Sequence, residues 1–223
     1  MPLLVSALFA ALVGWFIGRE IPAVADELLR RAYRRMNEVV LHEGWSPVEI
    51  ASRREYSACS SIGAACGVVF VGSQIDVLCA FLLSICAFAM AIAVLCDVRA
   101  RLIPFETCGV LAFAGSILQI QIGGFAGLMV GAVCAGVIMA GCGIANRMLR
   151  RSGKAVGWGD VRCMGALSLA SGALAPLGFA LSYGLAALYG LCGLAARTLS
   201  WSDGMPMAPF FVAWFMCVVV LAL

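Results

Sequence analysis

The stretch VLCAFLLSICAFAMAIAVLCDVRARLIP, residues 77–104, contains an uncharged apolar run that ends abruptly at Asp97. The run from Val77 to Cys96 has the length, about 20 residues, that a helix needs to cross the hydrocarbon core of a membrane. The whole chain shares this character, with 63% hydrophobic residues, 12% charged residues and a mean hydropathy of +1.02. This composition excludes an ordinary soluble domain.

Apolar runs of similar length recur along the rest of the chain. Backbone groups in lipid must find hydrogen bonds within their own segment, so each run predicts a helix. We therefore predict an all-α polytopic membrane protein with about eight transmembrane helices. The predicted spans lie near residues 2–18, 57–73, 76–96, 105–121, 123–146, 161–175, 177–196 and 208–223.

The basic residues predict the orientation of these spans. If the N-terminus is outside, all fifteen Lys and Arg fall in the inside segments or one to two residues beyond them. This asymmetry is what the positive-inside rule describes. The inside segments are 19–56, 97–104, 147–160 and 197–207.

The chain is expected to have three parts. Residues 1–18 form a first transmembrane helix, residues 19–56 a cytoplasmic loop with an amphipathic helix, and residues 57–223 the transmembrane core. The amphipathic helix is expected either to lie on the inner membrane surface or to pack on the inner helix ends. Pro22 is expected to mark its start, and the acid-first pair Glu27 and Arg31 is expected to support it.

Glycine and cysteine patterns indicate packing more than chemistry. Gly123, Gly127 and Gly131 recur every four residues, a spacing that lets helix backbones approach closely. The eleven cysteines form no C-x-x-C pair, so neither a zinc ribbon nor a redox pair is indicated. His42 is the only histidine, which excludes a site built on several histidine ligands. We expect no metal and no other cofactor.

Two of the twelve acidic residues have an unusual setting. Asp97 directly follows an apolar run, and Asp160 opens another in the sequence GWGDVRCMG, residues 157–165. Both lie at the inner membrane border in the predicted topology. Either alone could simply mark where water begins, but two acids at one depth on separate helices are better explained as a pair.

Paired carboxylates have a defined chemistry. Two close carboxylates in a medium of low dielectric constant share one proton, because both cannot ionise cheaply. The ionised member can activate a water molecule, and the protonated member can polarise a carbonyl and later protonate the leaving amine. This is the logic of an aspartic protease.

Three ordered motifs carry a resemblance to a known family. DVRARLIP, residues 97–104, resembles the D-x-R-x-x-x-I-P element of prepilin peptidases, the type IV leader peptidases. GWGDVRCMGALSLASG, residues 157–172, resembles their G-x-G-D element, and MPMAPFFVAW, residues 205–214, resembles their late proline-containing motif. The sequence is thus similar to intramembrane aspartyl proteases of the G-x-G-D class.

The resemblance implies a function and a site. Family members cut the short basic leader from type IV prepilins or pseudopilins at the cytoplasmic face of the inner membrane. Carried over, the catalytic pair is Asp97 and Asp160. The residues expected to shape the site around this pair are Gly157, Gly159, Pro104, Pro206 and Pro209. The expected partners are these precursors and the lipid bilayer, with no nucleic acid.

The leader is basic, so its recognition is expected to use acids of the cytoplasmic segment. The candidate substrate-binding residues are Glu38, Glu43, Glu49 and Glu55. Long family members carry two C-x-x-C pairs in this segment, forming a zinc-binding domain associated with N-methylation. This segment has no cysteine before Cys59, so the resemblance implies a peptidase without that domain and leaves methyltransferase activity open.

The sequence departs from the family pattern at two positions. Phe105 stands where members usually have asparagine after the motif proline, and Arg162 stands where a lysine often follows G-x-G-D-V. Two alternative functions remain at this point. One is a protease related to presenilin and signal peptide peptidase, which would have tyrosine where Cys96 stands. The other is a non-enzymatic small transporter or assembly subunit, in which the acids would serve packing and ion passage.

Overall fold

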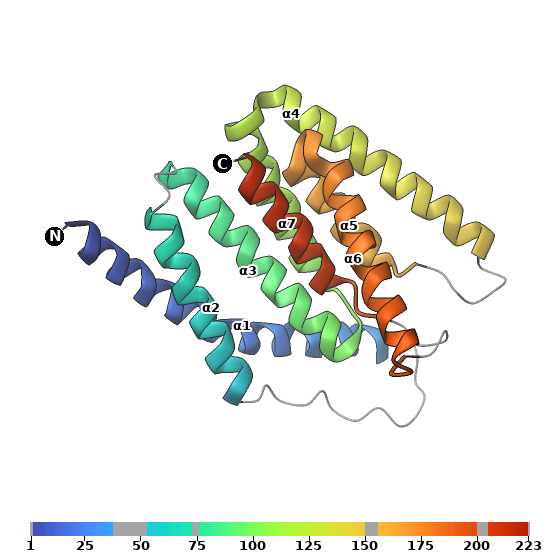
Figure 1. Ribbon diagram of the computed structural model, residues 1–223, viewed down its shortest axis with the longest axis horizontal. Coiled ribbons are helices and arrows are strands. Elements are labelled where there is room, and N and C mark those ends of the chain that lie inside the picture. Colours follow the sequence, from blue (N-terminus) through green and yellow to red (C-terminus); the bar gives the residue numbers. More distant parts are fainter. Residues whose placement is uncertain (1, 38–52, 73–75, 150–155, 200–204, 223) are drawn as a thin grey trace. The chain divides into compact units, whose positions relative to one another are not determined.

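The computed structural model describes residues 2–37, 53–72, 76–149, 156–199 and 205–222, and every element in these ranges is a helix (Figure 1). The elements are α1 (Pro2–Asn37), α2 (Arg53–Gly72), α3 (Val77–Ala100), α4 (Phe105–Leu149), α5 (Trp158–Ser171), the short 3-10 helix η2 (Gly172–Leu174), α6 (Ala175–Ala195) and α7 (Ala208–Ala222). The predicted all-α fold is confirmed for this part of the chain.

Three helical stretches are long and apolar enough to cross a membrane: Val77–Ala100, Phe105–Met148 and Trp158–Ala195. A shorter apolar helix covers Ala208–Val219. The chain is therefore a helical membrane protein. Its helices divide into two compact units, residues 1–104 and residues 105–223, which are described separately below.

In the first unit, α1 and α2 meet through glycines. A Cβ added to Gly14 would collide with the backbone carbonyl of Gly63, and a Cβ added to Gly63 would collide with that of Gly14. One turn further along α1, Gly18 lies equally close to the carbonyl of Cys59. The two backbones can approach this closely only because no side chains stand between them.

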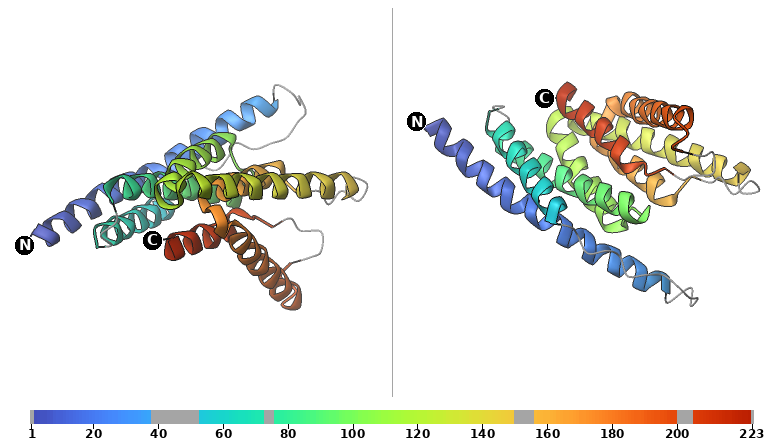
Figure 2. Two further views of the ribbon diagram at one scale, coloured as in Figure 1. Left: turned by 90° about the horizontal axis from the view of Figure 1, so that it is seen from above. Right: turned by 60° about the horizontal axis from the view of Figure 1, so that its bottom comes forward.

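α1 is one continuous helix that passes through Pro22, so the expected boundary at this proline is wrong (right view of Figure 2). A proline inside a helix loses one hydrogen bond, here the one to the carbonyl of Gly18, and crowds that carbonyl. Burial offsets this cost, because Ile21, Pro22, Ala25 and Leu29 form one buried face. The first predicted span and the predicted amphipathic helix thus belong to the same element.

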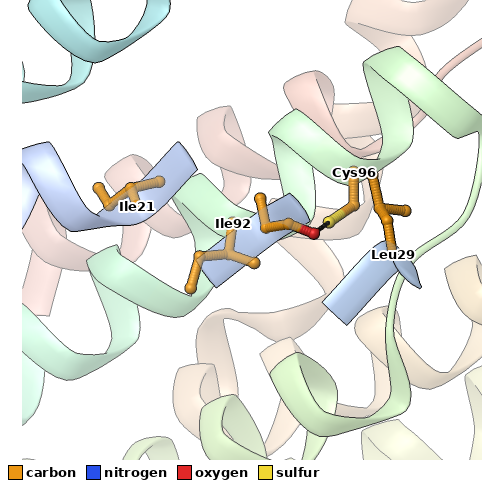
Figure 3. Packing of buried hydrophobic residues seen from close by; sticks show 5 residues of the cluster. Ile21, Leu29, Ile92 and Cys96 are labelled. Atoms are coloured by element: carbon orange, nitrogen blue, oxygen red, sulfur yellow. Dashed lines mark hydrogen bonds between the residues drawn. The ribbon is translucent and has the colours of Figure 1, made fainter. Parts of the chain in front are cut away.

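The buried face of α1 packs on α3 (Figure 3). Ile21 and Leu29 of α1 form an apolar cluster with Ile92 and Cys96 of α3. The Cys96 thiol donates a hydrogen bond of 3.8 Å to the Ala25 carbonyl, which shows how closely the helices approach. This packing sets α1 against the last two turns of α3, next to Asp97.

The outer face of α1 carries the predicted ion pair. Arg31 Nε donates to Glu27 Oε1 at 2.8 Å, one turn apart on the exposed side of the helix. This hydrogen bond, together with the charge of Arg31, holds the pKa of Glu27 below its ordinary value. The prediction of acid-first support for this segment is confirmed.

In the second unit, glycines with positive φ divide the long helical stretches. Gly124, at φ 65° and ψ −173°, bends α4 two residues beyond the expected boundary between the predicted spans 105–121 and 123–146 (Figure 1). Gly172, at φ 55°, ends α5 before η2 and α6. Side chains other than glycine rarely adopt this φ region, so both breaks occur where the sequence offers a glycine.

The glycine repeat of α4 has two uses. Gly131 faces the backbone carbonyls of Ser168 and Leu169, so it allows the predicted close approach, here to α5. Gly123 and Gly127 instead leave room for the side-chain amide of Gln119, on the same helix. The packing prediction is therefore confirmed for Gly131.

The late motif supplies an anchor for α7. Trp214 is fully buried, and its indole Nε1 donates to Ser171 Oγ at 2.8 Å. The ring lies so close to Gly178 of α6 that no Cβ would fit there. α7 is thus fixed to the end of α5 and to α6 by one aromatic side chain.

We predict that Gly63→Ala destabilises the protein, because its new methyl group would push the backbones of α1 and α2 apart. Overpacking of this kind costs about 1–3 kcal/mol. Thermal unfolding in detergent should show a lower midpoint. Gly109→Ala is the matched control, since nothing lies within 4 Å of its new Cβ. An unchanged midpoint for Gly63→Ala would contradict the close contact.

Candidate active site

Asp97 lies in the last turn of α3 and is only 4% exposed. Its backbone carbonyl accepts a hydrogen bond of 2.8 Å from the N–H of Arg101, whose left-handed conformation ends the helix. Burial and the negative end of the helix dipole both disfavour a carboxylate at this position. A buried acid that the local structure disfavours is a candidate for function.

Arg99, two residues further on, joins three helices. Its Nε and Nη2 atoms bind the two carboxylate oxygens of Glu55 on α2 at 3.1 and 2.7 Å, and its Nη1 binds Asp26 of α1. The side chains of Arg99 and Asp26 are only 12% and 13% exposed. This Arg99 ion-pair cluster therefore ties the end of α3, and with it Asp97, to both other helices of the first unit.

The sequence analysis did not find this cluster. From the sequence, Arg99 is the arginine of the D-x-R motif and one of the inside positive charges, and Glu55 is a candidate for leader binding. The structure places Glu55 in a forked contact with Arg99, and its role toward a leader stays a prediction. Glu38, Glu43 and Glu49 lie outside the described residues. The arginine of the D-x-R motif is a signal in the sequence, but its partners lie 73 and 44 residues away and no local pattern predicts them.

Asp160 is in the first turn of α5 and is half-buried. A negative charge at this end of a helix is favoured, because the first N–H groups carry partial positive charge. Gly157 is the N-cap residue, and its carbonyl accepts a hydrogen bond of 3.1 Å from the N–H of Val161. The start of α5 therefore holds Asp160 in a setting opposite to that of Asp97.

Gly157 is needed for space and not for backbone conformation. Its φ of −61° and ψ of 135° are open to any residue. A Cβ at this position would, however, lie 3.0 Å from Asp160 Oδ2. Gly157 therefore leaves space beside the Asp160 carboxylate, and unusual dihedral angles are not required there.

Asn146, near the end of α4, binds the segment that leads into α5. Its side-chain Nδ2 donates to the Val156 carbonyl at 3.0 Å, and its Oδ1 accepts from the Val156 N–H at 2.7 Å. Val156 is the residue immediately before Gly157. Sequence reasoning missed Asn146, because one asparagine in an apolar helix has no local pattern that names its partner.

The two departures from the family pattern meet in the second unit. The Arg162 guanidinium lies 5.5 Å from the centroid of the Phe105 ring, a cation–π contact between α5 and the first residue of α4.

The other residues expected to shape the site lie at helix starts. Pro104 is buried directly before α4, Pro206 precedes α7, and Pro209 is in the first turn of α7. Gly159, the other glycine of the motif, is in the first turn of α5.

Asp97 belongs to the first unit and Asp160 to the second, so their pairing stays a prediction. In the ranges that the structure describes, no three His, Cys, Asp or Glu side chains form a group able to hold a metal ion.

The family model for the type IV leader peptidase family matches residues 77–191. The chain belongs to this family. The matched region runs from the start of α3 into α6 and contains both Asp97 and Asp160, so the resemblance seen in the sequence is confirmed. The protein is therefore a membrane peptidase. No curated protein and no solved structure matches the chain.

We predict that Arg99→Met lowers the free energy of unfolding by about 3 kcal/mol, because it removes the cation that the mostly buried Asp26 and the partly buried Glu55 share. Adding Asp26→Asn and Glu55→Gln should recover at least part of this loss, since the negative charges that Arg99 balanced are then removed. Thermal unfolding in detergent measures both variants.

Arg31→Gln is the control for the Arg99 variants, because it breaks an exposed pair, and pairs of this kind contribute little to stability. An Arg99→Met protein as stable as the control would show that the cluster does not hold the unit together.

We also predict that Gly157→Ala lowers peptidase activity about tenfold, because the methyl group displaces the Asp160 carboxylate while the fold is kept. The measurement is the initial rate of cleavage per folded enzyme. Gly136→Ala is the matched control, a helical glycine with open space around its new Cβ. Equal rates for both variants would exclude the proposed crowding.

Proposed function

We propose that this peptidase removes the short basic leader from type IV prepilins or pseudopilins, with Asp97 and Asp160 as its catalytic pair. The observation that carries the proposal is that the family match contains two acids at helix ends, each in a motif of its own. Asp97 is buried beside an ion-pair cluster, and Asp160 has a glycine that leaves its carboxylate room.

In the proposed reaction, the ionised aspartate takes a proton from a water molecule, which attacks the scissile carbonyl. The protonated aspartate donates a hydrogen bond to the carbonyl oxygen, and a proton then passes to the leaving amine as the peptide bond breaks. The pair of carboxyl groups thus gains one proton from the water and gives one proton to the amine. It ends, as it began, with one proton shared between the two groups. The step uses only water and the two side chains.

The proposed topology places this chemistry at the cytoplasmic face of the inner membrane. We propose eight crossings with the N-terminus outside, in which α4 contributes two separated at Gly124 and the stretch from α5 to α6 contributes two separated at Gly172. The positive-inside rule supports this orientation, because the basic residues adjoin the ends of α3 and α5 that carry the aspartates.

Recognition of the leader is proposed to use the acids of the first inside segment. Glu38, Glu43 and Glu49 are in this segment, and Glu55 is at the start of α2. Carboxylates placed beside the site would attract a basic leader and hold it by charge-assisted hydrogen bonds. Glu55 already binds Arg99, so we expect it to contribute less than the other three.

The test is cleavage of a co-expressed prepilin precursor, followed by mass spectrometry of the product. We expect Asp97→Asn and Asp160→Asn each to lower the rate by at least about 10³-fold, because an asparagine amide can neither take the proton from water nor give one to the leaving amine. Asp76→Asn is the control: Asp76 caps the other end of α3 by accepting from the Leu78 N–H at 3.2 Å, and asparagine caps equally well.

The assignment would be wrong if either aspartate variant cleaved at the wild-type rate. The mass of the product gives the bond that is cut, and it also shows whether the new N-terminus gains a methyl group.

A further inference from the structure

The backbone N–H and the backbone carbonyl of Val156 are both held by one side chain. Asn146 donates to its carbonyl at 3.0 Å and accepts from its N–H at 2.7 Å, across ten residues of sequence. Asn146 is only 8% exposed in a helix that is otherwise strongly apolar. A buried amide is costly unless it is hydrogen-bonded, and here both of its ends are.

Two parallel contacts fix orientation as well as position. A single hydrogen bond would hold only one of the two peptide groups that flank Val156, whereas the pair restrains both and so fixes the backbone of Val156 before the chain enters α5. The usual anchor is missing at this helix start, because Gly157 as N-cap residue has no side chain to bond to the first turn. The Asn146 amide instead anchors Val156, the residue before the N-cap, from α4.

Val156 is only four residues before Asp160, the candidate catalytic residue. Val156 is followed by Gly157, whose carbonyl accepts from the Val161 N–H and whose Cα faces Asp160 Oδ2. The body of α5 is held separately, through the close contact of its Ser168 and Leu169 carbonyls with Gly131. The Asn146 contact thus adds a polar anchor directly before the first turn of α5, beside the Arg162–Phe105 contact and the packing of the buried Val161.

We propose that Asn146 is a positioning residue for Asp160, acting through the Val156 peptide. The proposal rests on the proposed function, because the group being positioned is the proposed catalytic carboxylate. Asn146 touches neither substrate nor water in this role. Its loss should misplace the carboxylate slightly, and displacements on the scale of 1 Å can lower a rate about 100-fold.

Two variants at this position separate positioning from general damage to the fold. Asn146→Leu removes both contacts and should lower kcat about 10- to 100-fold with KM little changed. Asn146→Asp keeps the acceptor for the Val156 N–H but loses the donor while ionised. Once protonated, its carboxyl group can donate to the Val156 carbonyl, so the contact is restored in acid.

The ratio of Asn146→Asp to wild-type activity should therefore rise between about pH 8 and about pH 5, where a carboxyl facing a carbonyl oxygen gains its proton. The charged groups on the two elements that meet here are Glu106 and Arg147 of α4 and Asp160 and Arg162 of α5. Cys108 and Cys142 of α4 and Tyr183 of α6 are titratable side chains that interact with Asp160, and all of these groups are the same in the proteins compared. Arg147→Gln is the control. Arg147 follows Asn146 in the sequence but its side chain is exposed, so this variant should keep wild-type kcat.

Hydrogen–deuterium exchange gives a readout that does not depend on cleavage. Asn146→Leu should speed exchange over residues 157–163 and leave residues 165–171 unchanged, because only the first turn loses its anchor. The proposal is overturned by wild-type kcat in Asn146→Leu, by an Asn146→Asp protein that does not recover in acid, or by unchanged exchange. A wild-type protein that cleaves no prepilin would contradict the proposed function instead, and the exchange measurement would still decide the role of Asn146.

Discussion

A chain in a membrane must satisfy its backbone hydrogen bonds within its own segments, and this constraint shapes every described part of the protein. It makes each element a helix and confines departures from helical geometry to a few places. Those places are the two glycines with positive φ, Gly124 and Gly172, and the helix ends. Both candidate catalytic acids are at helix ends, where a polar side chain can be present without interrupting an apolar transmembrane segment.

The two helix ends are held in different ways. At the end of α3 the contacts are ionic, because Arg99 binds acids from α1 and α2 beside the buried Asp97. At the start of α5 the contact is neutral, because the Asn146 amide pairs with the Val156 peptide. In each case a neighbouring helix, and not the local sequence, fixes the turn that carries the acid. Rigid supports of this kind are what a site needs to keep its groups in reacting geometry.

Glycine has three separate physical roles in this chain. Gly63 lets two helix backbones touch, Gly124 supplies a left-handed φ, and Gly157 leaves space for a carboxylate. The chain contains 25 glycines, so composition could not assign these roles. The repeat at Gly123, Gly127 and Gly131 pointed to packing, yet the backbone contact between α1 and α2 came from glycines that no prediction had singled out.

Sequence alone determined the helical membrane class, the family and the two acids in their motifs. These follow from hydrophobic run length and from short ordered motifs, both of which are local properties of the chain. Tertiary structure alone decided the partners of Arg99, the partner of Asn146 and the continuity of α1 through Pro22. Each of these depends on side chains brought together from distant helices, and helix packing has no counterpart in the local sequence pattern.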